Sequence, residues 1–250
     1  MALTCVPLHH AIDQRSAVYV RGLTGEDEQA VASSDTLAAV EFIDRVCVRA
    51  CEDALAPGQA IDLTAHDRDR ILAALYKQVY GPQVQGVATC DACGEPFDFS
   101  FALDDLLASL EYSQVSVADA PAIHIPTGRD ELSVAGLSSA EAVRELARRC
   151  LGNDIGGDQR IDGVLRAQAP ILALELDAPC PECGAVCHVD FDIQSILLGS
   201  LLRERSLLVR EIHQIALTYR WSLSDILSLP RGQRRQFADL AGNGPEPATR

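Results

Sequence analysis

The chain has 250 residues, of which 36 are acidic and 21 are basic, so its formal net charge is −15 at pH 7. A hydrophobic share of 48% and a charged share of 23% are typical of a globular protein with a core. The charge argues against a protein that mainly binds nucleic acid or an anionic membrane surface, because both tasks need clustered Lys and Arg. The sequence contains no run of 18 apolar residues and no basic, apolar leader, so we expect a cytoplasmic protein.

The N-terminal region is predicted to form a short strand followed by helices. Residues 17–20 have strand character, and the acids at 26–28 suit the positive end of a helix dipole. Apolar residues at three- and four-residue steps predict a helix over 35–55. Thr64, with Asp67 three residues later, predicts the N-cap of a second helix.

Two short strands with a cysteine turn between them are predicted over residues 83–101. Phenylalanines alternate at positions 97, 99 and 101, which is typical of a strand with one buried face. A second copy of this arrangement is predicted over residues 172–191. Each copy contains a Cys-x-x-Cys-Gly turn, here called a knuckle, at residues 90–94 and 180–184.

The segment between the two knuckles is predicted to be mixed. Residues 123–126 indicate a strand that runs into a turn at 127–130, and residues 131–134 either return antiparallel or lead on. Ser138 and Glu141 form a capping box at the start of a helix. Residues 152–163 are polar and rich in glycine, which favours a mobile loop.

The C-terminal region is predicted to be helical. A long helix is expected over 193–219, a short helix after Ser222 as N-cap, and a third helix after Leu229-Pro230 that continues to Leu240. Residues 242–250 are expected to be a disordered tail.

Four cysteines of the knuckles are candidate metal ligands: Cys90, Cys93, Cys180 and Cys183. A Cys-x-x-Cys turn places two thiolates at adjacent corners of a tetrahedron, and two such turns make a closed structural Zn²⁺ site. The 86 residues between Cys93 and Cys180 exceed the usual insert, so they would be a folded module inside a split zinc ribbon.

The knuckles allow three other interpretations. In the first, the thiols are free or the site has lost its metal. In the second, the cysteine pairs are redox-active, which needs a low-pKa thiol, usually at a helix N-terminus. The third is a zinc deaminase, because Cys93-Gly94-Glu95 and the second knuckle imitate its pattern. A strand after Glu95 and a fourth cysteine that closes the site argue against that reading.

The remaining cysteines have simpler interpretations. Cys47 and Cys51 lie one helical turn apart on a predicted apolar face, and Cys150 ends a helix stripe, so all three are expected in the core. Cys187-His188 stands close enough to the second knuckle to supply a spare metal ligand. No catalytic triad or general base emerges from the spacing of the histidines.

The C-terminal helices superficially imitate a helix-turn-helix whose basic cluster would face DNA. That cluster is Arg231, Arg234 and Arg235. The alternative is an ordinary helical corner with Trp221 at the junction and arginines that face solvent or an acidic partner. The net charge favours this corner, and a single tryptophan beside arginines suits a protein-binding anchor.

Along most of its length the sequence resembles the T-even-type baseplate hub assembly proteins, a chaperone-like family of contractile phage tails and phage-tail-like injection systems. The resembling segments are residues 20–28, 63–70, the first knuckle with its Phe-rich strand, 125–130 (Ile-Pro-Thr-Gly-Arg-Asp), the second knuckle, and 212–229 with its Tyr-x-Trp and Leu-Pro. The resemblance implies a non-enzymatic role in building a baseplate, with baseplate or hub proteins as partners.

We therefore expect an α+β protein built on a split zinc ribbon, with two CxxC knuckles on β-hairpins, a long α/β insertion and a helical C-terminal region. The expected regions are 1–82; 83–192, with an inserted module at 102–170 and the second knuckle at 172–192; 193–241; and the tail 242–250. Structural Zn²⁺ is the expected cofactor, and no nucleic acid, membrane or small-molecule substrate is expected. A zinc-ribbon nucleic-acid-binding regulator is the alternative, and a metalloenzyme with an open site is a further rival.

Overall fold

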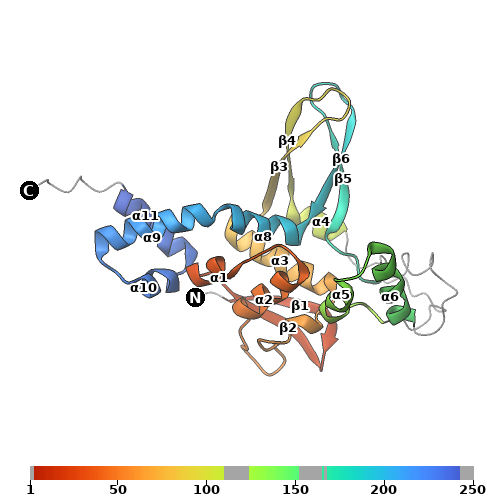
Figure 1. The fold of residues 1–250 in the computed structure, drawn as a ribbon, viewed down its shortest axis with the longest axis horizontal. Helices are drawn as coiled ribbons and strands as arrows, with labels where there is room; N and C mark the ends of the chain where they lie inside the picture. The colour runs from red at the N-terminus through yellow and green to blue at the C-terminus, as the bar shows by residue number, and fades with distance from the viewer. Residues whose placement is uncertain (1–2, 110–123, 152–164, 166–167, 243–250) are drawn as a thin grey trace, which may run out of the picture.

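The computed structural model describes residues 3–109, 124–151, 165 and 168–242 (Figure 1). Within these residues the strands form three separate antiparallel hairpins, and helices lie between and around them, so the fold is α+β as expected. The strands are β1 (Leu3–Ile12), β2 (Arg15–Arg21), β3 (Gln83–Thr89), β4 (Pro96–Ala102), β5 (Ala173–Pro179) and β6 (Val186–Asp192).

The helices cover most of the remaining described residues. They are α1 (Gly25–Ala30), α2 (Thr36–Val46), the 3-10 turn η1 (Ala60–Asp62), α3 (Ala65–Tyr80), α4 (Leu103–Ser109), α5 (Gly128–Val134), α6 (Ser139–Leu151), α8 (Ile193–Arg203), α9 (Arg205–Tyr219), α10 (Leu223–Ser228) and α11 (Arg231–Gly242). Among the residues that the structure describes, no helix combines the length and the apolar character that a membrane crossing requires.

The main core lies between the β1–β2 hairpin and the helices α2, α3 and α8. Alternate residues of β2, such as Val18 and Val20, are fully buried, as a strand with one covered face requires. Leu72 of α3 and Leu197 of α8 are also fully buried in this cluster. The first helix of the expected C-terminal region therefore packs into the same core as the N-terminal region.

The N-terminal region differs from the sequence-based expectation in three respects. The helix predicted over 35–55 ends at Val46, because the chain then turns extended and bridges β2, with the Val48 N–H donating to the Tyr19 carbonyl at 2.8 Å. Cys47 is buried as expected, but Cys51 is exposed, so its prediction as a core residue is wrong. Strand β1 was not predicted at all.

The strand predicted at 123–126 is also wrong in its described part, because residues 124–126 have no regular structure and α5 begins directly after them. Thr127 starts this helix: its N–H and Oγ1–H both donate to Asp130, at 3.0 and 2.9 Å. A capping box of this kind satisfies the free N–H groups of a helix start. The loop expected at 152–163 and residues 243–250 of the expected tail lie outside the described residues, whereas Gly242, the first residue of that tail, ends α11.

The start of α5 is joined to the start of α3. Thr127 and Thr64 form an isolated antiparallel bridge, in which the Gly128 N–H donates to the Leu63 carbonyl at 2.9 Å. Arg68, one turn into α3, forms an ion pair with Glu131 at 3.0 Å. This unit, here called the central clamp, consists of residues 63–68 and 127–131.

Of the three helices predicted for the C-terminal region, the second and third are confirmed as α10 and α11. Ser222 caps α10, as expected, and accepts a hydrogen bond from the Asp225 N–H. The helix predicted over 193–219 is instead two helices, α8 and α9, which meet at Glu204. This interruption turns the Glu204 carboxylate toward Arg231 and Arg235 of α11.

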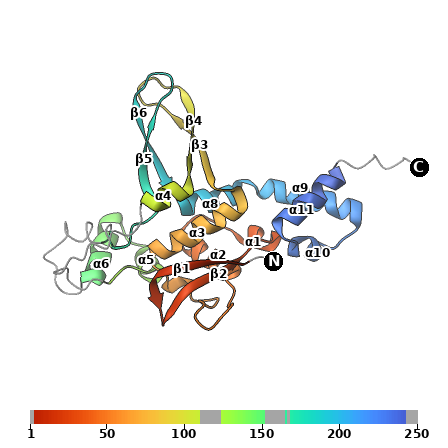
Figure 2. The same ribbon diagram turned by 180° about the vertical axis from the view of Figure 1, so that it is seen from behind.

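The second and third hairpins stand side by side and project together from the body of the molecule (Figures 1 and 2). We call this projection the arm; it consists of β3, β4, β5, β6 and the two knuckles at its tip. At its base the rings of Phe101 and Phe191 meet edge to face, with centroids 5.2 Å apart. The arm therefore holds two hairpins, 71 residues apart in sequence, in face-to-face contact.

Candidate metal centre

The two knuckles have the same backbone structure. In the first, the Cys90 N–H donates to the Glu95 carbonyl at 3.0 Å and the Gly94 N–H donates to the Cys90 carbonyl at 2.8 Å. In the second, the Cys180 N–H donates to the Ala185 carbonyl at 2.8 Å and the Gly184 N–H donates to the Cys180 carbonyl at 2.9 Å. Each turn is thus held closed by its own hairpin.

Glycine is required at the fifth position of each knuckle. Gly94 has φ of 78° and Gly184 has φ of 75°, a left-handed conformation that side chains with a Cβ disfavour. A reversal at this point lets the strand leave the turn while both thiols stay on one side. The Cys-x-x-Cys-Gly spacing therefore has a direct structural cause in both hairpins.

The structure brings together the four cysteines that the sequence predicts. The Sγ atoms of Cys90 and Cys183 lie 3.6 Å apart and those of Cys93 and Cys180 lie 3.8 Å apart, and all four lie within 4.8 Å of one another. A tetrahedral ion with metal–sulfur bonds of about 2.3 Å separates its ligands by about 3.8 Å. The cluster is the one group in the described residues with the geometry to hold a metal ion.

The electrostatics of the cluster favour a cation. The N–H groups of Cys93 and Ala92 lower the pKa of Cys90 to about 6. The Glu95 N–H favours the Cys93 thiolate, but burial and the neighbouring thiols together raise the pKa of Cys93 to about 12. Four thiolates in so small a space repel one another, and a divalent ion at their centre removes that cost.

No other cysteine of the described residues belongs to the group of four, although Cys187 forms a side-chain hydrogen bond with Cys90. Cys187 is buried beside the knuckles, with its Sγ 3.8 Å from the Ala185 carbonyl, and it is not one of the four clustered ligands. Cys150 is buried, as expected for a core residue. Glu95, the residue that imitates a deaminase general acid, is exposed and is followed directly by strand β4.

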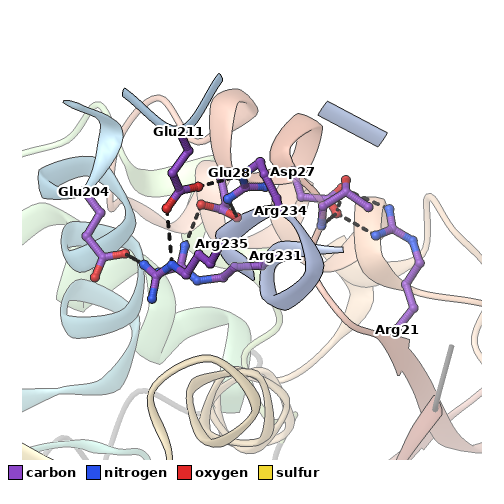
Figure 3. A network of polar contacts seen from close by, with 9 residues as sticks. Arg21, Asp27, Glu28, Glu204, Glu211, Arg231, Arg234 and Arg235 are labelled. Atoms are coloured by element: carbon purple, nitrogen blue, oxygen red, sulfur yellow. Dashed lines mark hydrogen bonds and ion pairs between the residues drawn. The ribbon is translucent and has the colours of Figure 1, made fainter. Parts of the chain in front are cut away.

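The arginines predicted as a partner-binding surface lie mostly inside the protein, which corrects that prediction. Figure 3 shows them in a network with acids of α1 and α9. The side chain of Arg234 is fully buried and that of Arg231 is 8% exposed; both bond to Glu28, at 2.7 and 2.5 Å. Only Arg235 stays substantially exposed, at 41%, and it too forms an ion pair with Glu204.

Acidic partners from the same chain explain this burial. Arg231 also pairs with Glu204, and the Nε of Arg234 donates to Glu211 at 2.7 Å (Figure 3). Charge-assisted hydrogen bonds to carboxylates offset much of the cost of removing an arginine from water, although Arg231 Nε and Arg234 Nη1 have no hydrogen-bond partner among the described residues. The acidic partner that the sequence suggested is therefore the protein itself.

Trp221 lies at the corner between α9 and α10. Its ring is 5.3 Å from that of Tyr219 and 5.0 Å from that of Phe237, and the residue is half-buried. The aromatic cluster fills the junction of the three C-terminal helices. This matches the expected helical corner and uses much of the Trp221 surface for packing within the chain.

A repeat in the sequence, which the sequence reasoning did not detect, underlies the arginine network. The pentapeptide Thr-Gly-x-Asp-Glu occurs at residues 24–28 and again at 127–131. Thr24, the first residue of the first copy, forms an isolated bridge with Pro230, and Arg234 follows Pro230 by four residues. In the same way Thr127, the first residue of the second copy, bridges Thr64, and Arg68 follows Thr64 by four residues. We call residues 24–28 with 229–235 the C-terminal clamp.

Comparison with known proteins adds no assignment: no family model, no curated protein and no solved structure matches the chain.

Proposed function

We propose that the four cysteines hold a structural Zn²⁺ ion, and that the protein is a non-enzymatic assembly factor that works by contacts with other proteins. The observation that carries this proposal is the closed cluster of four sulfurs at the tip of the arm. Four cysteine ligands in tetrahedral geometry suit zinc and leave no position for an activated water. The ion would then serve structure rather than catalysis.

A structural ion has a clear task in the arm. The β3–β4 and β5–β6 hairpins form separate sheets, with no ladder between them in the described residues. An ion bound by two cysteines of each hairpin would cross-link them as the halves of a split zinc ribbon. Because the unfolded chain has no preformed site, the binding free energy of the ion becomes folding free energy.

The assignment to a contractile-tail baseplate rests on sequence resemblance alone. The segments at 20–28 and 125–130, which carry much of that resemblance, are helix starts of the two clamps. We propose baseplate or hub proteins as the partners of this chain, either during assembly or in the finished particle. The alternative, a nucleic-acid-binding regulator, is weakened because Arg231 and Arg234 are buried in ion pairs.

Metal content tests the first half of the proposal. We expect about one zinc ion per purified chain, with a sulfur-only coordination shell in X-ray absorption spectra. Cys90→Ser and Cys183→Ser should lose the metal and the soluble folded state. Cys5→Ser and Cys51→Ser are matched controls, since both thiols are exposed and lie outside the cluster. Soluble, metal-free and functional Cys90→Ser protein would refute a structural ion, and a water ligand would revive the metalloenzyme.

Partner identity tests the second half. We expect a tagged full-length chain, expressed with its natural neighbours and cross-linked before purification, to retain tail or baseplate proteins identified by mass spectrometry. Recovery of transcription machinery in place of tail proteins would overturn the proposed assignment and favour the regulator.

A further inference from the structure

The arm contains an apolar groove between its two hairpins. Its volume is about 430 Å³, and it opens between the edges of β4 and β5. The walls are the inner faces of the hairpins, with Phe99 and Phe101 on one side and Leu176 and Val189 on the other. The lining extends from Phe97 and Pro179, near the knuckles, to Asp105 and Leu106 of α4 at the base of the arm.

The strands that border the groove have free edges. β4 is paired only with β3, and β5 only with β6, in the described part of the chain. A strand edge offers a row of unpaired N–H and C=O groups, to which an extended segment of another protein can add as a further strand. Alternate side chains of that segment would point between the two hairpin faces, where the groove is apolar.

The charge of the arm specifies the partner. Residues 83–109 and 173–192, which are the arm together with α4 at its base, contain ten acidic residues and no Lys or Arg, so these 47 residues carry ten of the fifteen net negative charges of the chain. Asp98, Asp105 and Asp177 line the groove itself. Lys77 pairs with Asp104 at the base of the arm, at 2.6 Å, and no arginine or lysine lines the groove. The four thiolates around a divalent ion add further negative charge to the tip.

We infer that the groove of the arm binds an extended segment of a partner protein in which apolar residues alternate with Lys or Arg. The apolar residues enter the groove and the basic ones meet its acidic rim. A second copy of this chain does not fit, because two arms of the same sign repel each other. This inference rests on the proposed function and specifies the chemistry of the partner.

The probe for the test is an array of fluorescent ten-residue peptides in which Val, Ile, Leu or Phe alternates with Lys or Arg. Controls contain the same residues in scrambled order, or Glu in place of Lys and Arg. We expect metal-loaded full-length protein to bind alternating basic peptides saturably, and to bind the controls at least about tenfold more weakly. Hydrogen exchange should show new protection at residues 97–102 and 176–179 and not in α9 or α11.

Charge-reversal variants on the rim give a matched comparison. Asp98→Lys with Asp177→Lys changes the rim of the groove, whereas Glu175→Lys with Asp190→Lys changes a cross-strand pair on the same arm that does not line the groove. Both double variants alter the net charge equally, and each removes one contact to His188. The rim variant should weaken binding by at least about tenfold, and the control variant by less than about threefold.

Several results would overturn the inference. They are no saturable binding by any alternating peptide, equal weakening by both double variants, preference for acidic peptides, protection outside the arm, or self-association of the chain at the groove. If these occur while the protein still holds zinc and retains tail proteins, the inference fails and the proposed function stands.

Discussion

The C-terminal and central clamps share the pentapeptide Thr-Gly-x-Asp-Glu, yet the side chain of Glu28 is 5% exposed and that of Glu131 is 22% exposed. In both, the threonine and the aspartate close the same capping box, so the local sequence determines the helix start. The surroundings differ: Glu28 bonds two arginines, whereas Glu131 bonds Arg68 and the Thr36 hydroxyl. We therefore expect burial depth, rather than local sequence, to determine how much each clamp contributes to the free energy of unfolding.

The largest expected effect follows from removing the buried arginine of each clamp. Arg234→Met should lower the free energy of unfolding by about 3 kcal/mol, because it deprives Glu28 and Glu211 of a partner inside the protein. Arg68→Met should cost only about 1–2 kcal/mol, since Glu131 is partly solvated and keeps Thr36. Urea denaturation of both variants measures the difference, and equal losses would contradict the role of burial depth.

The glycine of each clamp provides a second comparison. A Cβ at Gly25 would lie 2.9 Å from both Arg234 Nη1 and Leu227 Cδ2, and at Gly128 it would lie 3.0 Å from the Ile61 carbonyl oxygen. We expect Gly25→Ala and Gly128→Ala each to cost about 1–3 kcal/mol through overpacking.

Gly232 in the first turn of α11 is the matched control for the glycine substitutions. Apart from its chain neighbours and the backbone of its own helix, no described atom lies within 4 Å of its ideal Cβ, so Gly232→Ala should stabilise the protein by about 0.5–1 kcal/mol. Thermal unfolding of all three variants measures the signs. A destabilised Gly232→Ala variant would show that a Cβ near a helix start is unfavourable even where it contacts no neighbouring residue.

Acid should weaken both clamps through their aspartates. Burial raises the pKa of Asp27, but the Arg21 guanidinium and the Thr24 N–H and O–H groups outweigh it and hold the pKa below its usual value. Burial also raises the pKa of Asp130. Hydrogen bonds from the Thr127 N–H, His124 and Arg149 outweigh burial and hold this pKa below its usual value. A depressed folded-state pKa gives stability that is present above the unfolded pKa of about 3.9 and is lost as the pH falls further.

The test of the two aspartates is the pH and salt dependence of unfolding. Asp27→Asn and Asp130→Asn should each cost about 1–2 kcal/mol at pH 7 and flatten the loss of stability below about pH 5. Salt should reduce the Asp130→Asn effect more, because Asp130 and its partner Arg149 are 13% and 34% exposed, whereas Asp27 and its partner Arg21 are 3% and 26% exposed. Unchanged acid slopes in both variants would contradict the assignment.

The smallest effect concerns a position where the clamps differ in charge. Asp69 follows Arg68 in the central clamp, as the exposed Arg235 follows Arg234 in the C-terminal clamp. Burial raises the pKa of Asp69 to about 7, although Arg68 and the Leu172 N–H oppose this shift. A raised folded-state pKa means that stability falls as the pH rises toward and through that value. Asp69→Asn should therefore stabilise the protein by roughly 1 kcal/mol at pH 8 and by nothing near pH 4. Arg235→Gln is the control, which should show no pH dependence between these values.

Much of the four-cysteine cluster could be predicted from the sequence, because its determinants are local. A Cys-x-x-Cys-Gly turn reverses the chain direction by itself, and the alternation of apolar and polar residues in the flanking strands determines which face is buried. The helix caps at Thr64, Ser138 and Ser222 were likewise predictable from the residues three positions on.

The arginine network was not predictable, because its determinants are distant. Glu28 is 203 residues before Arg231, and arginines on a polar helix normally indicate a solvated face. At residues 125–130 two local signals compete: Ile125-Pro126 favours extended chain, while Thr127 and Asp130 favour a helix start. The bridge to Thr64, which no local pattern reveals, favours the helix.

The distance between the knuckles in the sequence has a consequence for the time course of synthesis. Cys93 leaves the ribosome 90 residues before Cys183, which at about 5–20 residues per second is roughly 5–20 s. During this interval the first hairpin has two cysteines of a four-ligand site and a Phe-rich face without its cover. The nascent chain therefore passes through a period in which its arm is half-built, and an early metal ion would be held by only two sulfurs.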